Sequence, residues 1–257
     1  MLVEVDGEPP LILDMGTGLR ALGHHLNAPL VAEGKPLRGN ALLTHLHYDH
    51  VLGTPFFPPM RDPGALLEIY GPPQTDDSLQ MTMAGLVKPP FFPVHMADFR
   101  GELRYLDLEI ESEFSIGGIS VKVRPIPHIG TTLGFRIEAD GVAVAYMPDH
   151  QAPVDRTTVA DSVLELCAGA DLLIHDAQYT EDEFVELSDW GHSTPSYAVH
   201  VAAEAGVKRL DMFHHDPGHT DRQLDAMLRG ARQIAQTAGR LEVNAAKEGA
   251  TFELRKR

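Results

Sequence analysis

The stretch Thr44-His45-Leu46-His47-Tyr48-Asp49-His50 is the part of this 257-residue chain that decides its fold. It places four side chains that can bind a metal within six positions, a density that has almost no purely structural use. The residues before it, Asn40 to Leu43, are short and apolar like the end of a buried strand, and Gly53 and Pro55 close the segment after it. The cluster therefore lies on a loop that leaves a strand, where functional side chains are usually mounted.

The side chains of this loop predict a metal site. Imidazole and carboxylate ligands without cysteine suit zinc, and equally manganese or iron. His45 and His47 are two residues apart on an extended segment, so they point the same way and can hold one ion. Asp49 and His50 lie beyond a bend and are free to face a second ion.

Length and composition indicate a globular chain. With 257 residues and 43% hydrophobic content it can bury a full core, and we expect one domain over residues 1–257. The start, Met1 to Asp14, carries no basic leader or long apolar run, so no signal peptide is expected, and no stretch reaches the length of a membrane span. Cys167 is the only cysteine and lies in an apolar helical pattern. It is predicted to be a core thiol in a reducing, cytoplasmic setting.

The charge balance bounds the substrate. The 37 acidic and 21 basic residues give a formal net charge of −16, and a broad nucleic-acid surface needs a basic stripe instead. No long nucleic acid is therefore expected as a partner. A small anionic substrate remains compatible, because two divalent ions invert the local field.

The pattern along the chain changes near its middle. The first half is mostly strand, with one clear helix over Thr17 to Leu26, and from Thr157 onward helices and strands alternate. The strands are expected at Leu2 to Val5, Leu11 to Leu13, Ala41 to Thr44, Leu66 to Tyr70, Leu103 to Leu106, Ile119 to Arg124, Thr132 to Glu138, Val142 to Tyr146, Leu172 to His175 and Arg209 to His214. The later helices are expected at Thr157 to Ala168, Pro195 to Ala205 and Asp221 to Ala238, the second capped by Ser193 or Thr194.

The segment at about 55–99 is unusual in its Pro-Pro pairs, Phe-Phe pairs and methionines. It is interpreted as an insertion over the active loop. Two roles remain open, a lid that shapes an apolar part of the pocket and a connection with its own small core. Its apolar surface suits either a protein partner or a base that stacks on it.

Three further strand ends carry metal-binding side chains. His128 follows the strand that ends near Arg124, Asp149 and His150 follow the next one, and His214, His215 and Asp216 follow the last. A lone histidine at a strand end is more often a hydrogen-bonded surface residue than a ligand. Together with the first cluster, these positions support a site with two ions.

The run Thr44 to His50, then His128, Asp149 and His215, resembles in identity and order the metallo-β-lactamase superfamily of two-metal hydrolases. The resemblance extends from the segment Leu11-Ile12-Leu13-Asp14-Met15-Gly16-Thr17-Gly18 to the last strand. It implies an α/β fold, a four-layer αββα sandwich of two mixed β-sheets. Relatives in this family are often dimers, so a homodimer is also expected.

The resemblance also implies the ligand set. The first ion would take His45, His47 and His128, and the second Asp49, His50 and His215, with Asp149 bridging them. His214 is the alternative to His215. Asp14 corresponds to an aspartate that supports the ligand loop. Two divalent ions are implied as cofactors, with zinc expected and manganese or iron as alternatives.

The reaction class follows from a second resemblance. The segment His175-Asp176-Ala177-Gln178-Tyr179 and the later Gly191-His192-Ser193-Thr194 resemble the phosphodiesterase branch, which includes ribonuclease Z and enzymes acting on small cyclic phosphodiesters. Asp49 and His192 are the expected catalytic residues, His192 as a donor to a phosphoryl oxygen at a helix N-terminus. Hydrolysis of a small phosphodiester by a metal-bridging hydroxide is predicted. A lactonase or β-lactamase-type carbonyl hydrolase is the alternative, and a redox or non-catalytic metal protein is less favoured.

Overall fold

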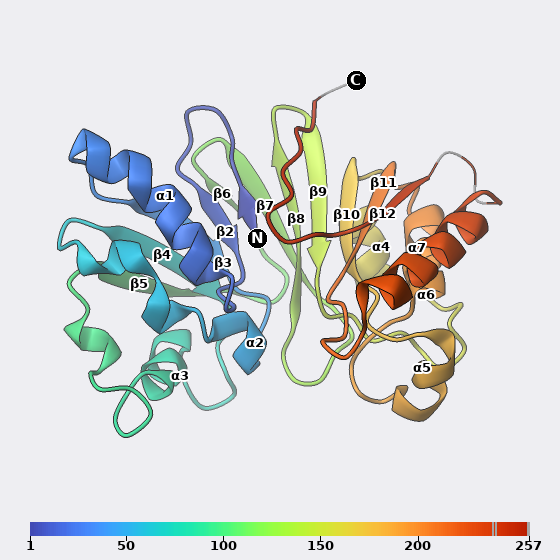
Figure 1. Ribbon diagram of the computed structural model, residues 1–257, viewed down its shortest axis with the longest axis horizontal. Helices are drawn as coiled ribbons and strands as arrows, with labels where there is room; N and C mark the ends of the chain where they lie inside the picture. The colour runs from blue at the N-terminus through green and yellow to red at the C-terminus, as the bar shows by residue number, and fades with distance from the viewer. Residues whose placement is uncertain (238, 240, 256–257) are drawn as a thin grey trace. The chain divides into compact units, whose positions relative to one another are not determined.

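The computed structural model describes residues 1–237, 239 and 241–255. The chain divides into two compact units, Met1–Glu109 and Ile110–Arg257, and each contains one mixed β-sheet with helices beside it (Figure 1). Two mixed sheets flanked by helices are what the predicted fold class requires. Each unit has its own buried cluster of apolar side chains. The single domain expected over residues 1–257 remains a prediction.

The N-terminal unit is built on a five-stranded sheet of order β1-β2-β3-β4-β5, in which only β1 runs antiparallel to its neighbour. Alternate strand residues such as Ile12, Ala41 and Leu67 share a buried cluster with Leu19 of α1 and Met83 of α3. These helices therefore cover one face of the sheet. The elements are β1 (Leu2–Val3), β2 (Leu11–Leu13), α1 (Leu19–Glu33), β3 (Arg38–Leu42), α2 (Tyr48–Val51), β4 (Leu66–Gly71), α3 (Leu79–Leu86) and β5 (Glu102–Asp107).

The C-terminal unit is built on a seven-stranded sheet of order β12-β11-β10-β9-β8-β7-β6. Its first four strands in chain order form an antiparallel meander, and β9 to β12 pair in parallel because helices connect them. Val163 of α4, Val199 of α6 and Ala231 of α7 lie in one buried cluster with strand residues such as Leu173 and Leu210. The elements are β6 (Glu113–Ile116), β7 (Ile119–Pro125), β8 (Leu133–Ala139), β9 (Val142–Met147), α4 (Asp161–Cys167), β10 (Leu172–Asp176), α5 (Glu181–Leu187), α6 (Pro195–Glu204), β11 (Arg209–Phe213), α7 (Asp221–Ala235) and β12 (Glu242–Ala245).

Strand direction brings chemically active residues to one edge of each sheet. In the C-terminal unit β7, β9, β10 and β11 all run the same way, so the loops that follow them begin at one edge. Those loops carry His128, Asp149, Gln178 and His214. In the N-terminal unit the parallel neighbours β2 and β3 likewise end beside each other.

The helix predicted over Thr157 to Ala168 is shorter in the structure, where α4 begins at Asp161. The Asp155 carboxylate accepts hydrogen bonds from the backbone N–H groups of Thr157 (2.8 Å) and Thr158 (3.0 Å), which holds the chain in a turn there. A carboxylate that binds nearby backbone N–H groups competes with helix formation.

Other boundaries also differ from the sequence expectation. The first helix runs on through Pro29 to Glu33, beyond its predicted end at Leu26. The helix predicted to begin at Pro195 does so, with the Thr194 side chain as its cap. The last helix ends at Ala235, and its predicted end at Ala238 lies outside the described residues. Strands β6 and β12 and helices α2, α3 and α5 were not predicted. Asp49 and His50, which were expected on a loop, lie in the short helix α2.

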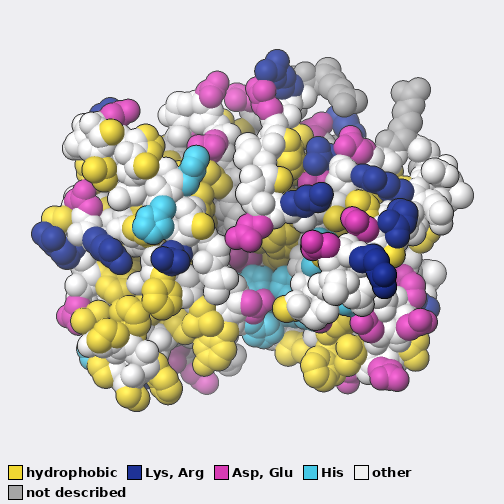
Figure 2. Space-filling model, in the orientation of Figure 1, with side chains coloured by type: hydrophobic (Ala, Val, Ile, Leu, Met, Phe, Trp, Pro, Cys, Tyr) yellow, Lys and Arg dark blue, Asp and Glu magenta, His cyan; other side chains and the backbone are white. Residues whose placement is uncertain are grey.

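The proline- and phenylalanine-rich segment at about 55–99 supplies β4, an internal strand of the N-terminal sheet. Figure 2 shows apolar side chains gathered over α3 and its surroundings, and Met81 and Phe91 are 63% and 85% exposed. The lid role stays a prediction. Among the described helices, none has both the length and the apolar character needed to cross a membrane.

Candidate metal centre

The histidine loop of the N-terminal unit is held by Asp14, which follows β2. The Asp14 carboxylate accepts hydrogen bonds from the Thr44 backbone N–H (2.8 Å) and hydroxyl (3.0 Å), and its Oδ2 lies 2.9 Å from Nδ1 of His50. Burial by itself would raise the pKa of Asp14, but the adjoining His50 ring and the Thr44 N–H hold it below its usual value. Asp14 is therefore an ionised anchor beneath the loop, as the resemblance implied.

Two glycines allow the chain to pack closely around this loop. The His50 carbonyl accepts a hydrogen bond from Met15 N–H (2.7 Å), and the Met15 carbonyl accepts one from Gly53 N–H (2.9 Å). A Cβ at Gly16 would overlap the carbonyl oxygen of Asp49, and one at Gly53 would overlap that of Gly16. Only glycine fits at both contacts.

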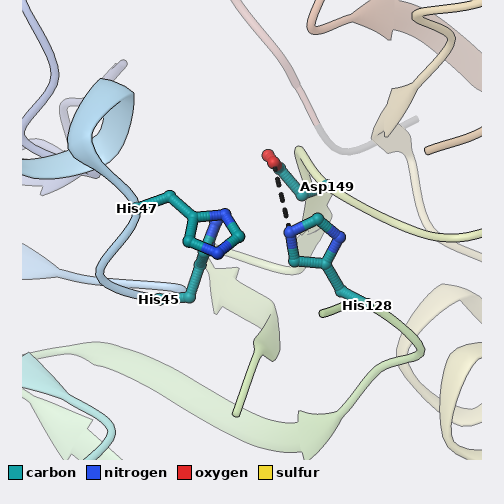
Figure 3. Close-up of side chains that lie close together, drawn as sticks. All are labelled: His45, His47, His128 and Asp149. Carbon is teal, nitrogen blue, oxygen red and sulfur yellow. Dashed lines mark ion pairs between the residues drawn. The ribbon is translucent and has the colours of Figure 1, made fainter. Parts of the chain in front are cut away.

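The predicted ligands of the N-terminal unit lie together. The rings of His45 and His47, drawn in Figure 3, are 4.4 Å apart between centroids, and His45 and His50 are 4.2 Å apart. His50 Nε2 lies 3.1 Å from an Asp49 carboxylate oxygen. His45 and His50 are buried, whereas His47 and Asp49 are exposed.

In the C-terminal unit, His128 and Asp149 face each other. Nε2 of His128 lies 3.7 Å from Oδ2 of Asp149, the pair joined by the dashed line in Figure 3. Nδ1 of His128 lies 2.7 Å from the Gly191 carbonyl oxygen. Gly191 has φ +93°, and a Cβ there would lie 2.5 Å from His128 Nδ1. The ring of His128 therefore rests against a position that only glycine can occupy without displacing it.

Asp176 anchors His192 from the end of β10. It is fully buried, and its Oδ2 lies 2.7 Å from Nδ1 of His192. The other oxygen accepts hydrogen bonds from the backbone N–H groups of Gln178 and Ser193, both at 3.0 Å. The His192 ring is stacked on that of His214, 5.0 Å away and inclined by 13°. Asp176, His192 and His214 form one of the groups whose ligand atoms lie within 4.8 Å of one another.

His214, the alternative to His215, lies beside Asp149, another predicted ligand of the C-terminal unit. Nε2 of His214 lies 3.4 Å from Oδ1 of Asp149, and Nδ1 lies 2.7 Å from Oε1 of Gln178. The backbone of His214 has φ +54°, which is the left-handed conformation. His215 belongs to none of the metal-binding groups found among the described residues, and burial lowers its pKa.

Five histidines, two in the N-terminal unit and three in the C-terminal unit, share one arrangement of their ring nitrogens. Asp14 and Asp176 carboxylates and the Gly191 carbonyl can only accept, so the Nδ1 atoms facing them carry the hydrogen. The Thr44 hydroxyl donates to Asp14 and so accepts from His45 Nδ1, 3.0 Å away. In the neutral ring of each, Nε2 is then the nitrogen that could bind a metal ion. The histidines concerned are His45, His50, His128, His192 and, through Gln178, His214.

This donor set fits the implied metal. Imidazole Nε2 atoms whose Nδ1–H is held by the protein, together with carboxylates, are the usual ligands of zinc and of similar divalent ions. No sulfur donor takes part, since Cys167 is fully buried in the core, where burial raises its pKa. The prediction that Cys167 is a core thiol is confirmed.

Residues outside the ligand set have structural partners. Arg136 donates hydrogen bonds to the backbone carbonyls of Leu166 and Ala168, both at 2.9 Å. His150 is fully buried, and its Nδ1 lies 2.8 Å from Nε2 of His175. The sequence reasoning missed Asp176 as the partner of His192, although a strand-end aspartate is the same signal that singled out Asp149.

A family model described as "Beta-lactamase superfamily domain" matches residues 11–215. The chain is 29% identical to the protein named Ribonuclease Z of Mycobacterium bovis (strain BCG / Pasteur 1173P2), over 92% of this chain and 86% of that one. It is 28% identical to Ribonuclease Z of Mycobacterium marinum, over 94% and 88%.

Among solved structures, the metallo-beta-lactamase fold protein YhfI from Bacillus subtilis superposes with a TM-score of 0.68 at 21% identity, over 97% of this chain and 88% of that one. This likeness confirms the fold class predicted from the sequence.

Proposed function

Because the chain belongs to the metallo-β-lactamase superfamily and is a metal-dependent hydrolase of its phosphodiesterase branch, we propose that it cleaves a small phosphodiester at a centre of two divalent ions. A cyclic nucleotide is the substrate class to test first. The observation that carries the proposal is the Asp176–His192 pair, held 2.7 Å apart beside the metal-binding group that contains His214.

We assign the first ion to His45, His47 and His128, and the second to Asp49, His50 and His214, with Asp149 shared. Zinc is expected, and manganese or iron also suits these donors. When bound, a pair of such ions supplies Lewis acidity, which lowers the pKa of a coordinated water and offsets charge on a phosphoryl group. His214 replaces His215 in the set because its Nε2 faces Asp149. Asp49 keeps its proposed catalytic role.

His192 acts as a hydrogen-bond donor or acid toward the phosphoryl group. The Asp176 carboxylate accepts from Nδ1–H and stabilises the protonated ring, in which Nε2 also carries a hydrogen. Backbone N–H groups of Gln178 and Ser193 hold that carboxylate in place. The His192 side chain is 13% exposed, so solvent can reach the ring. Its hydrogen bond to Asp176 fixes its orientation.

The test compares bis(p-nitrophenyl) phosphate with a chromogenic lactam and a lactone, using protein loaded separately with zinc and manganese. We expect phosphodiester turnover that falls by about 10²- to 10⁴-fold in His192→Ala, the usual contribution of an acid–base group, and that also falls in Asp176→Asn. His24→Ala, at an exposed histidine of α1, is the matched control. Carbonyl hydrolysis alone, with His192→Ala unaffected, would favour the lactonase or lactamase alternative and reject the proposal.

RNA is the second candidate substrate, because the relatives at 28–29% identity are named Ribonuclease Z. The formal net charge of −16 favours the smaller substrate. In the view of Figure 2 the basic side chains of the C-terminal unit lie among acidic ones rather than in a separate stripe. A labelled RNA incubated with the same preparations decides between them. Cleavage of RNA at a higher kcat/KM than any small phosphodiester would replace the small-substrate proposal.

A further inference from the structure

Backbone hydrogen bonds hold the residues on both sides of Gln178, in the loop that follows β10. The Ala177 N–H donates to the Phe213 carbonyl (3.1 Å), and the Tyr179 N–H donates to the Ser193 carbonyl (3.0 Å). The Gln178 N–H itself donates to Asp176 (3.0 Å). Three successive N–H groups are thus held, by Phe213 of β11, by Asp176 at the end of β10 and by Ser193 before α6, so the backbone at Gln178 is fixed.

The amide of Gln178 links His214 to Asp216. Its Oε1 lies 2.7 Å from His214 Nδ1, and its Nε2 donates to Asp216 Oδ2 at 3.4 Å. Asp216 is held in turn, because its Oδ1 accepts from the Gly218 N–H at 2.7 Å. A carboxylate only accepts hydrogen bonds, so the NH₂ side of the amide must face Asp216 and the oxygen must face His214. His214 Nδ1 therefore carries the hydrogen.

We propose that Gln178 is a positioning residue whose amide, oriented by Asp216, fixes His214 as an Nε2 donor to the second ion. The inference rests on the proposed metal centre but not on its substrate. The other anchors, the Gly191 carbonyl and the Asp14 carboxylate, offer only acceptors, whereas an amide presents the wrong group if it turns over. Asp216 removes that ambiguity.

The variants follow from this donor and acceptor order. Gln178→Met keeps the length of the side chain and removes its hydrogen bonds. Asp216→Asn lets the Gln178 amide turn its NH₂ group toward His214. The double variant Gln178→Glu with Asp216→Asn restores the order of donors and acceptors. The carboxylate at position 178 accepts from Nδ1–H of His214, and the amide at position 216 donates to that carboxylate. Gln233→Met, at an exposed position of α7, is the matched control.

Two readouts on purified full-length protein test the proposal, with urea unfolding as a control for folding. Titration with Co²⁺ against a competing chelator measures the affinity of each ion, and long-range ¹H–¹⁵N NMR of metal-free protein reports the tautomer of His214. The His214 signal is assigned by its loss in His214→Ala. Loss of an orienting partner typically weakens metal affinity by about 10- to 100-fold.

We expect that weakening for one ion only in Gln178→Met and Asp216→Asn, with recovery to within about threefold in the double variant. The tautomer of His214 should be Nδ1–H in the unmodified protein and mixed in the single variants. Unchanged affinity and tautomer in Gln178→Met, or no recovery in the double variant, would overturn the proposal. If the unmodified protein binds fewer than two ions, the proposed two-ion centre is wrong. The NMR measurement of the His214 tautomer then still tests whether Gln178 orients the His214 ring.

Discussion

Replacing Gly191 by alanine should damage the protein in two separable ways. The backbone there has φ +93°, and a left-handed conformation costs alanine about 1–2 kcal/mol. The new Cβ would also lie 2.5 Å from Nδ1 and 2.6 Å from Cε1 of His128, about 1 Å closer than ordinary contact. To relieve this overlap the ring must move, which breaks its 2.7 Å hydrogen bond to the Gly191 carbonyl. Leaving a buried donor unpaired costs about 1–3 kcal/mol.

The free energy of unfolding of metal-free Gly191→Ala should therefore fall by about 2–5 kcal/mol, the sum of the two costs. Gly206→Ala is the control, because Gly206 has φ +66° and a Cβ there meets nothing within 4 Å. It should lose only the backbone cost, about 1–2 kcal/mol. Urea unfolding gives both values, and metal analysis should show a selective loss of the ion assigned to His128. Equal destabilisation of the two variants would refute the contact between the Gly191 position and the His128 ring.

Three further outcomes are expected. The Cys167 thiol, fully buried and with a raised pKa, should react with a thiol reagent only at the rate of unfolding, and fast labelling of native protein would contradict its burial. Hydrogen bonds from Arg124 and Lys122 lower the pKa of Glu165 from 4.5 to about 2, so their stabilising effect is present above pH 4.5 and disappears as the pH falls toward 2. Glu165→Gln should accordingly lower the free energy of unfolding at pH 7 by no more than about 1 kcal/mol, because these ion pairs are partly exposed. If the variant were equally less stable at pH 2 or in high salt, the ion pairs would not be the cause. Removal of metal with a chelator should lower the Tm and abolish hydrolysis, with about 2.7 kcal/mol of stability regained at a free metal concentration of 100 Kd; an unchanged Tm would argue against binding to the folded state.

Much of the site could be predicted from local sequence. The spacing of His45, His47, Asp49 and His50 predicts a cluster of metal-binding side chains from the sequence alone, because all four lie within six consecutive residues. Many strands and the capped helix at Pro195 could likewise be predicted, since hydrophobic periodicity and capping residues are local properties of the sequence. The short strands β6 and β12 were not predicted, because four residues are too few to show a clear alternation of apolar and polar side chains. Such strands form through pairing with their neighbours in the sheet.

The amino-acid sequence was enough to predict the types of side chain in the candidate metal site, which are imidazoles and carboxylates. The proposed choice of His214 over His215 rests on the folded chain, because Nε2 of the His214 ring lies 3.4 Å from Oδ1 of Asp149. Tertiary structure also gave His192 its partner, Asp176, since residues 16 positions apart meet only when the end of β10 and the start of α6 converge. Ligand types are fixed residue by residue, but the orientation of each ring depends on hydrogen bonds that only the folded chain can form.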